Sequence, residues 1–490
     1  MLREALVRAD YAGPRLQRVL RVERNIRDKP SELGIELRRL EDGGPLATLI
    51  KLFHIGLGVG HGEAEAAFAP LTLDRLAELG VLALGDVDVE PLVAISPVGG
   101  VFVVSDRIEL QPRHHDYVGP VSPGTVVLAA FTVRRRIGTA LDVGAGSGFQ
   151  ALQASRHADR VVATDVNPRA LRFTQFNAAL NERTNIEVRE GSLFEPVEGE
   201  SFDLIVSNPP YVIAPGNEYA FRDSGLPGDS FVEGLIRTVP AYLREGGVAQ
   251  VLVEWSLDPE QEWSEPLRRW VDGNGCDSLL FEFSEQEPLD YADLWNSPLR
   301  SDPVAHAASV DRWLEHLDRL GILRIGWGMI ALRRRSGANW VRTREDTLSA
   351  DRIEPAARHV ERAFAAEDFL AVRDDEALLT ERLALADDAV LEVQFTVSEG
   401  RRLVREAELA LQGGFRSRVK LDEHTLELVS RLDERRPLRE VLAGLAGEGA
   451  DQHAFDVAAA GAIRRLIELG FVVSGEEESL PEDLGSTETS

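Results

Sequence analysis

Residues 208–211, Asn-Pro-Pro-Tyr, are the part of the chain best suited to chemistry. They follow an apolar strand that must end at Asn208, because Pro209 and Pro210 have no backbone N–H to donate within a sheet. The side-chain oxygen of Asn208 can accept a hydrogen bond from a substrate N–H, and the prolines can hold a backbone carbonyl toward the same nitrogen. Tyr211 can cover a planar substrate and lie near a cation. These four residues therefore predict transfer of an electrophilic methyl group to a planar amide or amine nitrogen.

A glycine-rich loop forms the second chemical feature. It reads Leu-Asp-Val-Gly-Ala-Gly-Ser-Gly, and its glycines allow a tight turn and a close approach to a ligand. The spacing G-x-G-x-G differs from the G-x-G-x-x-G of dinucleotide-binding proteins. The loop predicts a cofactor site that contains Asp142, Gly144, Ala145, Gly146 and Gly148.

The ends of the next two predicted strands extend this cofactor site. Asp165, followed by Val166, can bond both hydroxyl groups of an adenosine ribose. An acid that recognises the adenine amino group is expected after the third strand, but Ser192-Leu193-Phe194 stands there. Either Ser192 serves in its place or this contact is lost, and Phe194 can still cover the adenine ring. We therefore predict that Val166, Ser192, Leu193, Phe194 and Asn208 also contact the cofactor.

Strands and helices alternate around these motifs. The predicted strands are residues 139–144, 160–165, 185–190, 202–208, 247–255, 277–283 and 323–332. Asn167 and Pro168 predict the start of the helix after Asp165, as N-cap and first helical residue. The pattern predicts an α/β fold with a doubly wound, largely parallel, seven-stranded Rossmann-like sheet and its ligand at the carboxyl ends of the strands.

Both flanks of this core are rich in helices. Residues 1–112 combine helical patterns with two strands around a Pro-Val-Gly-Gly turn, and residues 336–473 combine helices with strands. We predict a winged-helix-like domain on each side of a core at residues 113–335. Residues 474–490 carry acids and no base, which predicts a disordered tail.

Composition narrows the class of protein. The formal net charge is −28, from 82 acidic and 54 basic residues, which disfavours a nucleic-acid substrate. Cys276 is the single cysteine, and the N-terminus is too charged for a secretory signal. With no apolar run long enough for a membrane span, a cytoplasmic protein is expected. The sequence is compatible with a homodimer.

Two further segments have weaker signals. His114-His115-Asp116 lacks the spacing of a metal site, so no metal is predicted and packing against the cofactor loop is expected. Residues 221–231 are rich in glycine and proline and are equally suited to closing over a substrate or to forming a surface loop.

Three blocks carry a family resemblance: LDVGAGSGFQAL, VVATDVNPRALRFTQFNAALN and GSLFEPVEGESFDLIVSNPPYV. They resemble the class I S-adenosylmethionine-dependent methyltransferases, and in particular the HemK-like release-factor glutamine N5-methyltransferases, over roughly residues 113–335. The resemblance implies that Gly144, Gly146 and Asp165 hold S-adenosylmethionine and that residues 208–211 hold the nitrogen that accepts the methyl group. Ser192 replaces the family's aspartate, and the Arg-Pro-Glu run before the glycine loop is missing.

The functional hypothesis is therefore an S-adenosylmethionine-dependent N-methyltransferase that acts on a protein, a peptide or a small metabolite. The first alternative is a methyltransferase for a base amino group in ribosomal RNA or DNA, because the same motif geometry suits such bases. The second alternative is a non-catalytic regulator that senses the cofactor.

Overall fold

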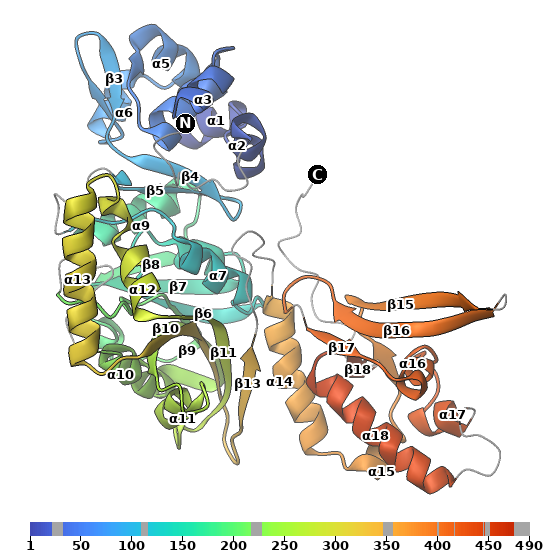
Figure 1. Ribbon diagram of the computed structural model, residues 1–490. Coiled ribbons are helices and arrows are strands. Elements are labelled where there is room, and N and C mark those ends of the chain that lie inside the picture. Colours follow the sequence, from blue (N-terminus) through green and yellow to red (C-terminus); the bar gives the residue numbers. More distant parts are fainter. Residues whose placement is uncertain are drawn as a thin grey trace. The chain divides into compact units, whose positions relative to one another are not determined.

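The computed structural model describes residues 1–21, 33–108, 116–216, 228–345, 356–398, 401–415, 417–443, 445 and 451–474 (Figure 1). The chain divides into two compact units, residues 1–129 with 136–352 and residues 130–135 with 353–490. The predicted boundary at residue 112 and the predicted tail after Ser474 lie outside the described residues. The predicted division into four parts stays a prediction.

An eight-stranded sheet forms the centre of the first unit, in the order β13-β11-β12-β10-β9-β6-β7-β8. Its strands are β6 (Ile137–Val143), β7 (Ala158–Asp165), β8 (Ile186–Glu190), β9 (Phe202–Ser207), β10 (Leu243–Leu257), β11 (Cys276–Gln286), β12 (Arg324–Arg334) and β13 (Val341–Glu345). β12 is antiparallel to both neighbours, and every other pair is parallel. All seven predicted strands are present, which confirms the α/β core. The prediction of seven strands was wrong by one, because β13 joins beside β11.

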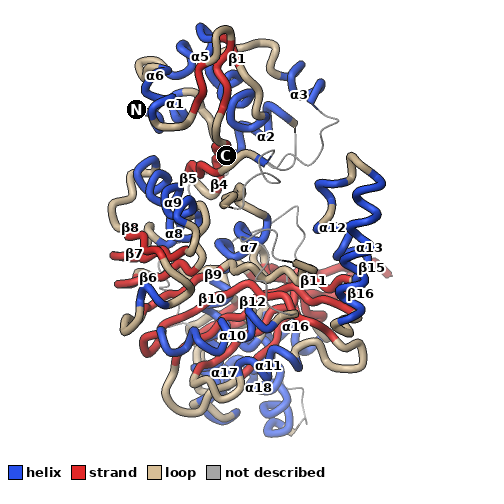
Figure 2. Tube along the Cα trace, turned by 90° about the vertical axis from the view of Figure 1, so that its left-hand side faces the viewer, coloured by secondary structure: helices blue, strands red, loops and turns tan. Residues whose placement is uncertain are grey.

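Helices cover this sheet on both sides (Figure 2). They are α7 (Pro123–Phe131), α8 (Phe149–Ala154), α9 (Pro168–Leu180), α10 (Ser230–Thr238) and α11 (Glu265–Val271), with short 3-10 turns η4 (Glu195–Val197) and η5 (Val239–Tyr242). The predicted start of α9 is confirmed, since the Asn167 side chain accepts a hydrogen bond from the Arg169 N–H. Because both faces of the sheet are covered, its central strands contain consecutive buried apolar residues, such as Leu204, Ile205 and Val206 of β9.

A helical insertion replaces a tight turn between β11 and β12. It contains α12 (Pro288–Trp295), η6 (Ser297–Leu299) and α13 (Pro303–Arg319), and α12 and α13 lie side by side in Figure 1. Tyr291, Ala292 and Trp313 of the insertion are buried against Val212 and Ile213, which follow the Asn-Pro-Pro-Tyr motif. The insertion is therefore part of the wall next to that motif.

The first 108 residues form the remainder of the first unit. They contain α1 (Leu2–Arg8), α2 (Gly13–Leu20), α3 (Leu33–Arg39), α4 (Pro45–Leu49), the π-helix η2 (Ile50–Ile55), β1 (Val59–Gly60), α5 (His61–Phe68), α6 (Leu73–Glu78), β2 (Leu82–Leu84), β3 (Asp88–Pro91), β4 (Ala94–Val98) and β5 (Val101–Ser105). β4 and β5 pair across the predicted turn, where Gly99 and Gly100 both have positive φ. The winged-helix character of this region stays a prediction.

Asn177 of α9 and Asn181, the C-cap of that helix, bind the outer edge of β5. Asn177 Oδ1 accepts from the Val104 N–H at 2.8 Å and its Nδ2 donates to the Val104 carbonyl at 2.9 Å. Asn181 bonds the N–H and the carbonyl of Phe102 in the same way, at 2.9 and 2.7 Å. The helix that begins beside Asp165 is thereby fastened to the hairpin.

The second unit is built around its own core. Its elements are α14 (Ala357–Ala371), α15 (Asp375–Leu378), β14 (Leu383–Leu385), β15 (Ala389–Ser398), β16 (Arg401–Leu411), β17 (Arg418–Lys420), α16 (Glu423–Val429), α17 (Leu438–Ala443), α18 (Gln452–Glu468) and β18 (Val472–Ser474). β14 pairs with β18, and β15, β16 and β17 form a second small sheet. Its winged-helix character also stays a prediction. Within the described parts of both units, no helix is long and apolar enough to cross a membrane.

A buried charged cluster joins four segments of the second unit. Asp388 binds His359 Nε2 at 2.6 Å and Arg362 Nη1 at 2.9 Å. His359 Nδ1 accepts from the Phe415 N–H, so its proton lies on Nε2 and is donated to Asp388. Arg362 also donates to the Gly470 carbonyl. Burial opposes ionisation of Asp388, but the His359 hydrogen bond and the Arg362 charge outweigh it and lower its pKa to about 2.

We expect Asp388→Ala to lower the free energy of unfolding by about 3–5 kcal/mol, because it leaves a buried cation without its partner. The control is Asp375→Ala, which removes the more exposed ion pair with Arg464 and should cost less than about 1 kcal/mol. The contribution of Asp388 is complete above its unfolded pKa of 3.8 and is lost as pH falls through about 2. Urea denaturation at pH 7 and pH 3 measures both effects, and equal losses in the two variants would contradict the role of the cluster.

Candidate active site

The glycine loop follows β6 and turns into α8. Gly144, Gly146 and Gly148 have φ of 72°, 56° and 80°, a region that disfavours other residues. A Cβ at Gly144 or Gly146 would meet nothing within 4 Å, so space for a ligand lies above the loop. Asp165, at the end of β7, accepts from the Gly146 N–H at 2.9 Å and fixes the loop's shape.

Asp142 lies under the same loop. Its side chain is 2% exposed and accepts a hydrogen bond from the Ala151 N–H at 2.8 Å. Burial, opposed by that hydrogen bond and reinforced by the charge of Asp165, raises the pKa of Asp142 to about 7. Burial likewise raises the pKa of Asp165. Two carboxyl groups whose ionisation is disfavoured therefore lie at the carboxyl ends of β6 and β7, where a cation would stabilise them.

The segment after β8 has an unexpected arrangement. The Ser192 N–H donates to Glu195 at 3.3 Å, and Leu193 has φ of 48°. Phe194 is 3% exposed and stacks on Tyr242, with ring centroids 4.3 Å apart. Its ring thus packs beside the segment that leads into β10. Ser192, Leu193 and Phe194 line a hollow of about 360 Å³ together with Tyr242. That Phe194 covers an adenine stays a prediction. Val166, by contrast, is 59% exposed directly after Asp165.

Asn208 lies where β9 ends beside β6. The Ser207 hydroxyl donates to the Val143 carbonyl at 2.9 Å, so the Asn-Pro-Pro-Tyr motif begins next to the glycine loop. Asn208 Nδ2 donates to the Thr125 hydroxyl of α7 at 2.8 Å. With its nitrogen held in this way, the side-chain oxygen of Asn208 is the end of the amide that is left for a substrate N–H.

The hydroxyl group of Tyr211 is held in place by its surroundings. Its hydroxyl accepts a hydrogen bond from the Trp327 indole, and burial raises its pKa above the ordinary value, with a further contribution from the charge of Glu254. A Cβ at Gly124 would lie 3.1 Å from that hydroxyl, so α7 approaches closely because this residue is glycine. Pro209 is buried and Pro210 is half-buried.

The structure brings most predicted site residues to one edge of the sheet. Asp142, Gly144, Gly146 and Asp165 lie beside Asn208, since β6 has β7 and β9 as its two neighbours. The cofactor contacts of Ser192, Leu193 and Phe194 stay predictions. His114, His115 and residues 221–227 lie outside the described residues, so neither the packing of the histidines nor the closing loop is tested.

Several residues in this region escaped sequence reasoning. Thr125 holds Asn208, and its carbonyl accepts from Gln150 Nε2 of α8 at 2.8 Å. Gln150 is buried, so this bond fixes α7 against the helix that follows the glycine loop. Glu254 and Tyr291 form a buried pair behind the motif. The polar Ser-Pro-Gly-Thr run at residues 122–125 is the sequence feature that could have indicated a role for Thr125.

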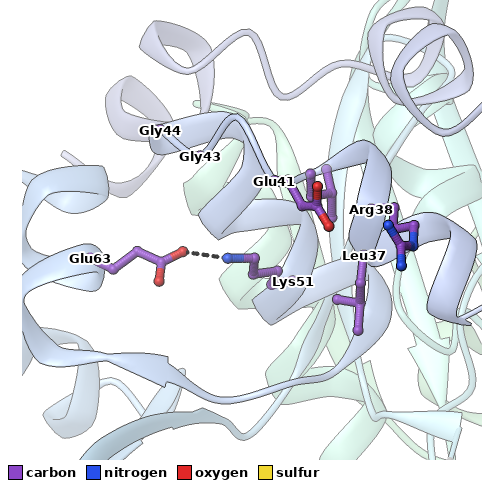
Figure 3. A pocket seen from close by; sticks show the side chains of 8 residues that line it. Leu37, Arg38, Glu41, Gly43, Gly44, Lys51 and Glu63 are labelled. Atoms are coloured by element: carbon purple, nitrogen blue, oxygen red, sulfur yellow. Dashed lines mark hydrogen bonds and ion pairs between the residues drawn. The ribbon is translucent and has the colours of Figure 1, made fainter.

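A separate hollow lies in the N-terminal region (Figure 3). It measures about 470 Å³ and is lined by residues that include Leu37, Arg38 and Glu41. Lys51 faces it but is paired with Glu63 at 2.9 Å, and Glu63 also accepts from Thr48. The hollow lies apart from the glycine loop and the Asn-Pro-Pro-Tyr motif, and none of the predicted site residues lines it.

Two family models match the chain. One, described as methyltransferase small domain, covers residues 119–269, and the other, described as a domain of unknown function (DUF7059), covers residues 32–92. The first match contains the glycine loop, Asp165 and the Asn-Pro-Pro-Tyr motif.

Named relatives agree with the first match. The release factor glutamine methyltransferase of Geobacter sulfurreducens is 33% identical over 237 residues, which are 44% of this chain and 77% of the relative. A protein of Methanocaldococcus jannaschii, named as a candidate protein N5-glutamine methyltransferase, is 37% identical over 136 residues, or 26% of this chain and 67% of the relative.

A solved ribosomal protein L11 methylase from Lactobacillus delbrueckii is 18% identical, with a TM-score of 0.27, over 44% of this chain and 80% of that one. This similarity adds nothing to the assignment, which rests on the family model, the relatives and the order of the strands. The chain is an enzyme that belongs to the class I S-adenosylmethionine-dependent methyltransferases, in the HemK-like group.

Proposed function

We propose that the enzyme methylates the side-chain amide nitrogen of a glutamine in a protein. The observation that carries the proposal is the tie between Asn208 Nδ2 and Thr125, which leaves the Asn208 oxygen to accept from an N–H of a planar amide. The relatives named as glutamine methyltransferases support the same acceptor.

The residues at the sheet edge fit the cofactor. Open space above Gly144 and Gly146 and the buried carboxyl of Asp142 together suit a ligand that brings a cation close to the loop. Asp165 would accept from ribose hydroxyls. S-adenosylmethionine, when bound, supplies an electrophilic methyl group on a positively charged sulfur.

On the acceptor side, the chain orients the nucleophile. The oxygen of Asn208 and a backbone carbonyl of the proline turn would each accept a hydrogen bond from one N–H of the amide. Tyr211 would cover the plane of the amide. Fixing the nitrogen in this way lowers the barrier through orientation, so no strong base is required of the chain. A nucleic-acid base would fit similar acceptors, but the net charge of −28 opposes a polyanion.

The experiment that tests this function is transfer of tritium from labelled S-adenosylmethionine to a cell extract. We expect label in protein, at N-methylated glutamine, and unaffected by nuclease. Asn208→Ala should lower the rate at least about 100-fold, because a hydrogen-bond acceptor at the reacting nitrogen is lost.

The control variant is Asn185→Ala, which removes a half-buried asparagine bonded to Ser155 and Ala158, just before β8 begins. It should keep most of the activity. Label that nuclease releases would favour the RNA or DNA hypothesis, and label on a different protein side chain would contradict a glutamine acceptor.

Cofactor binding should depend on pH through Asp142. Because burial raises its pKa to about 7, the carboxyl is largely protonated below that pH, and binding of the cationic cofactor should tighten as pH rises from 6 to 8. Calorimetry on wild type and Asp142→Asn measures this, and the variant should lose both affinity and the step near pH 7.

The same residue predicts an opposite effect on stability. Because its pKa is raised on folding, Asp142 weakens the fold as pH rises from 3.8 to about 7, by about 1.4 kcal/mol per pH unit across that interval. Asp142→Asn should therefore be more stable than wild type at pH 8 and equal to it near pH 3. A variant that binds as wild type does at every pH would show that Asp142 does not face the cofactor.

Thr125 offers a pair of matched variants. Thr125→Val keeps the side-chain volume but removes the hydroxyl, so the amide of Asn208 can turn and present its NH2 to the acceptor's own NH2. We expect its transfer rate to fall about 10–100-fold, whereas Thr125→Ser should stay within about threefold of wild type. Initial rates at saturating cofactor measure this effect, and equal rates in the two variants would show that Thr125 does not orient Asn208.

A further inference from the structure

A buried chain of hydrogen bonds lies directly behind the Asn-Pro-Pro-Tyr motif. The Ile213 N–H donates to the Tyr291 hydroxyl at 2.9 Å, and that hydroxyl lies 2.5 Å from Glu254 Oε2. Since the oxygen of Tyr291 accepts from the backbone, its proton is left for Glu254. Ile213, Tyr291 and Glu254 are 2%, 0% and 4% exposed. Water therefore cannot replace either bond.

Three separate elements meet at this one hydroxyl. Tyr291 belongs to α12 of the helical insertion, Glu254 to β10, and Ile213 lies two residues beyond Tyr211. The ring of Tyr291 packs against Trp295 and Trp313, with centroids 6.2 and 5.9 Å away. The ring is thus fixed by packing, and its hydroxyl sets the position of the backbone after the motif.

Glu254 interacts electrostatically with the Asn-Pro-Pro-Tyr motif. Burial raises the pKa of Glu254 to about 8, although the hydrogen bond from Tyr291 opposes the rise. After burial, the charge of Glu254 is the next cause that raises the pKa of Tyr211 and of Tyr291. The carboxyl therefore faces a tyrosine of the motif and a tyrosine of the insertion. Apolar packing would join these elements without the cost of burying a carboxyl group. It would not fix their relative orientation as a hydrogen bond does.

We propose that Tyr291 and Glu254 are positioning residues for methyl transfer. They hold the backbone of residues 211–213 and so set the angle at which Asn208 and Tyr211 meet the acceptor. The identity of that acceptor rests on the proposed function, whereas the hold on the backbone does not.

The first test compares Tyr291→Phe with Tyr11→Phe. Tyr11 is also fully buried, and its hydroxyl donates to the Ile95 carbonyl at 2.9 Å in the N-terminal region, so it controls for the loss of a buried hydroxyl. In Tyr291→Phe, amide hydrogen exchange of Tyr211, Val212 and Ile213 should speed up at least about 10-fold. The initial rate of tritium transfer to extract protein should fall about 10–100-fold, with the calorimetric affinity for S-adenosylhomocysteine and the KM for S-adenosylmethionine within about twofold.

The second test concerns Glu254. Glu254→Gln keeps an oxygen that can accept from Tyr291 and should retain most of the rate, whereas Glu254→Leu fills the space without an acceptor and should behave as Tyr291→Phe does. The proposal is overturned if Tyr291→Phe changes exchange and rate no more than Tyr11→Phe, or if the Gln and Leu variants are alike. If the wild type methylates no protein glutamine, the proposed function fails, while the amide exchange of Tyr211, Val212 and Ile213 still decides the positioning role.

Discussion

The hydrogen bond from Asn208 to Thr125 is the contact on which the rest of the site depends. A primary amide has a donor end and an acceptor end, and a half turn about one bond exchanges them. By holding the nitrogen, Thr125 determines which end meets the acceptor. Gln150 joins Thr125 to α8, which follows the glycine loop, so one polar chain links the two halves of the site. The sheet brings these groups close, and the hydroxyl orients them.

Three acids with shifted pKa values are of two kinds. Asp142 and Glu254 lie at the carboxyl edge of the sheet, and burial raises their pKa values to about 7 and about 8. Asp388 lies in the other unit, where His359 and Arg362 lower its pKa to about 2. The first kind weakens the fold at neutral pH and is typical of functional sites, whereas the second kind strengthens it.

Much of the core could be predicted from sequence, because each strand is an apolar run bounded by turn residues. β13 could not, since its Val-Arg-Thr-Arg-Glu is an edge strand with polar residues and no apolar run. Thr125 was missed because its partner is 83 residues away, and no spacing rule joins them. The stacking of Phe194 on Tyr242 was not predicted either, because Tyr242 comes from a distant helical turn. Local patterns predict elements, while side-chain partners depend on packing between elements.

The asparagine pair on α9 has a consequence for assembly. The β4–β5 hairpin would otherwise present a row of unpaired N–H and carbonyl groups, which is a template for strands of another chain. Asn177 and Asn181 form hydrogen bonds with these groups at Val104 and Phe102. Two side chains at the C-terminal end of α9 therefore take the place of a third strand. This edge is closed to further strands, and the hairpin cannot serve there as a seed for intermolecular β-sheet growth.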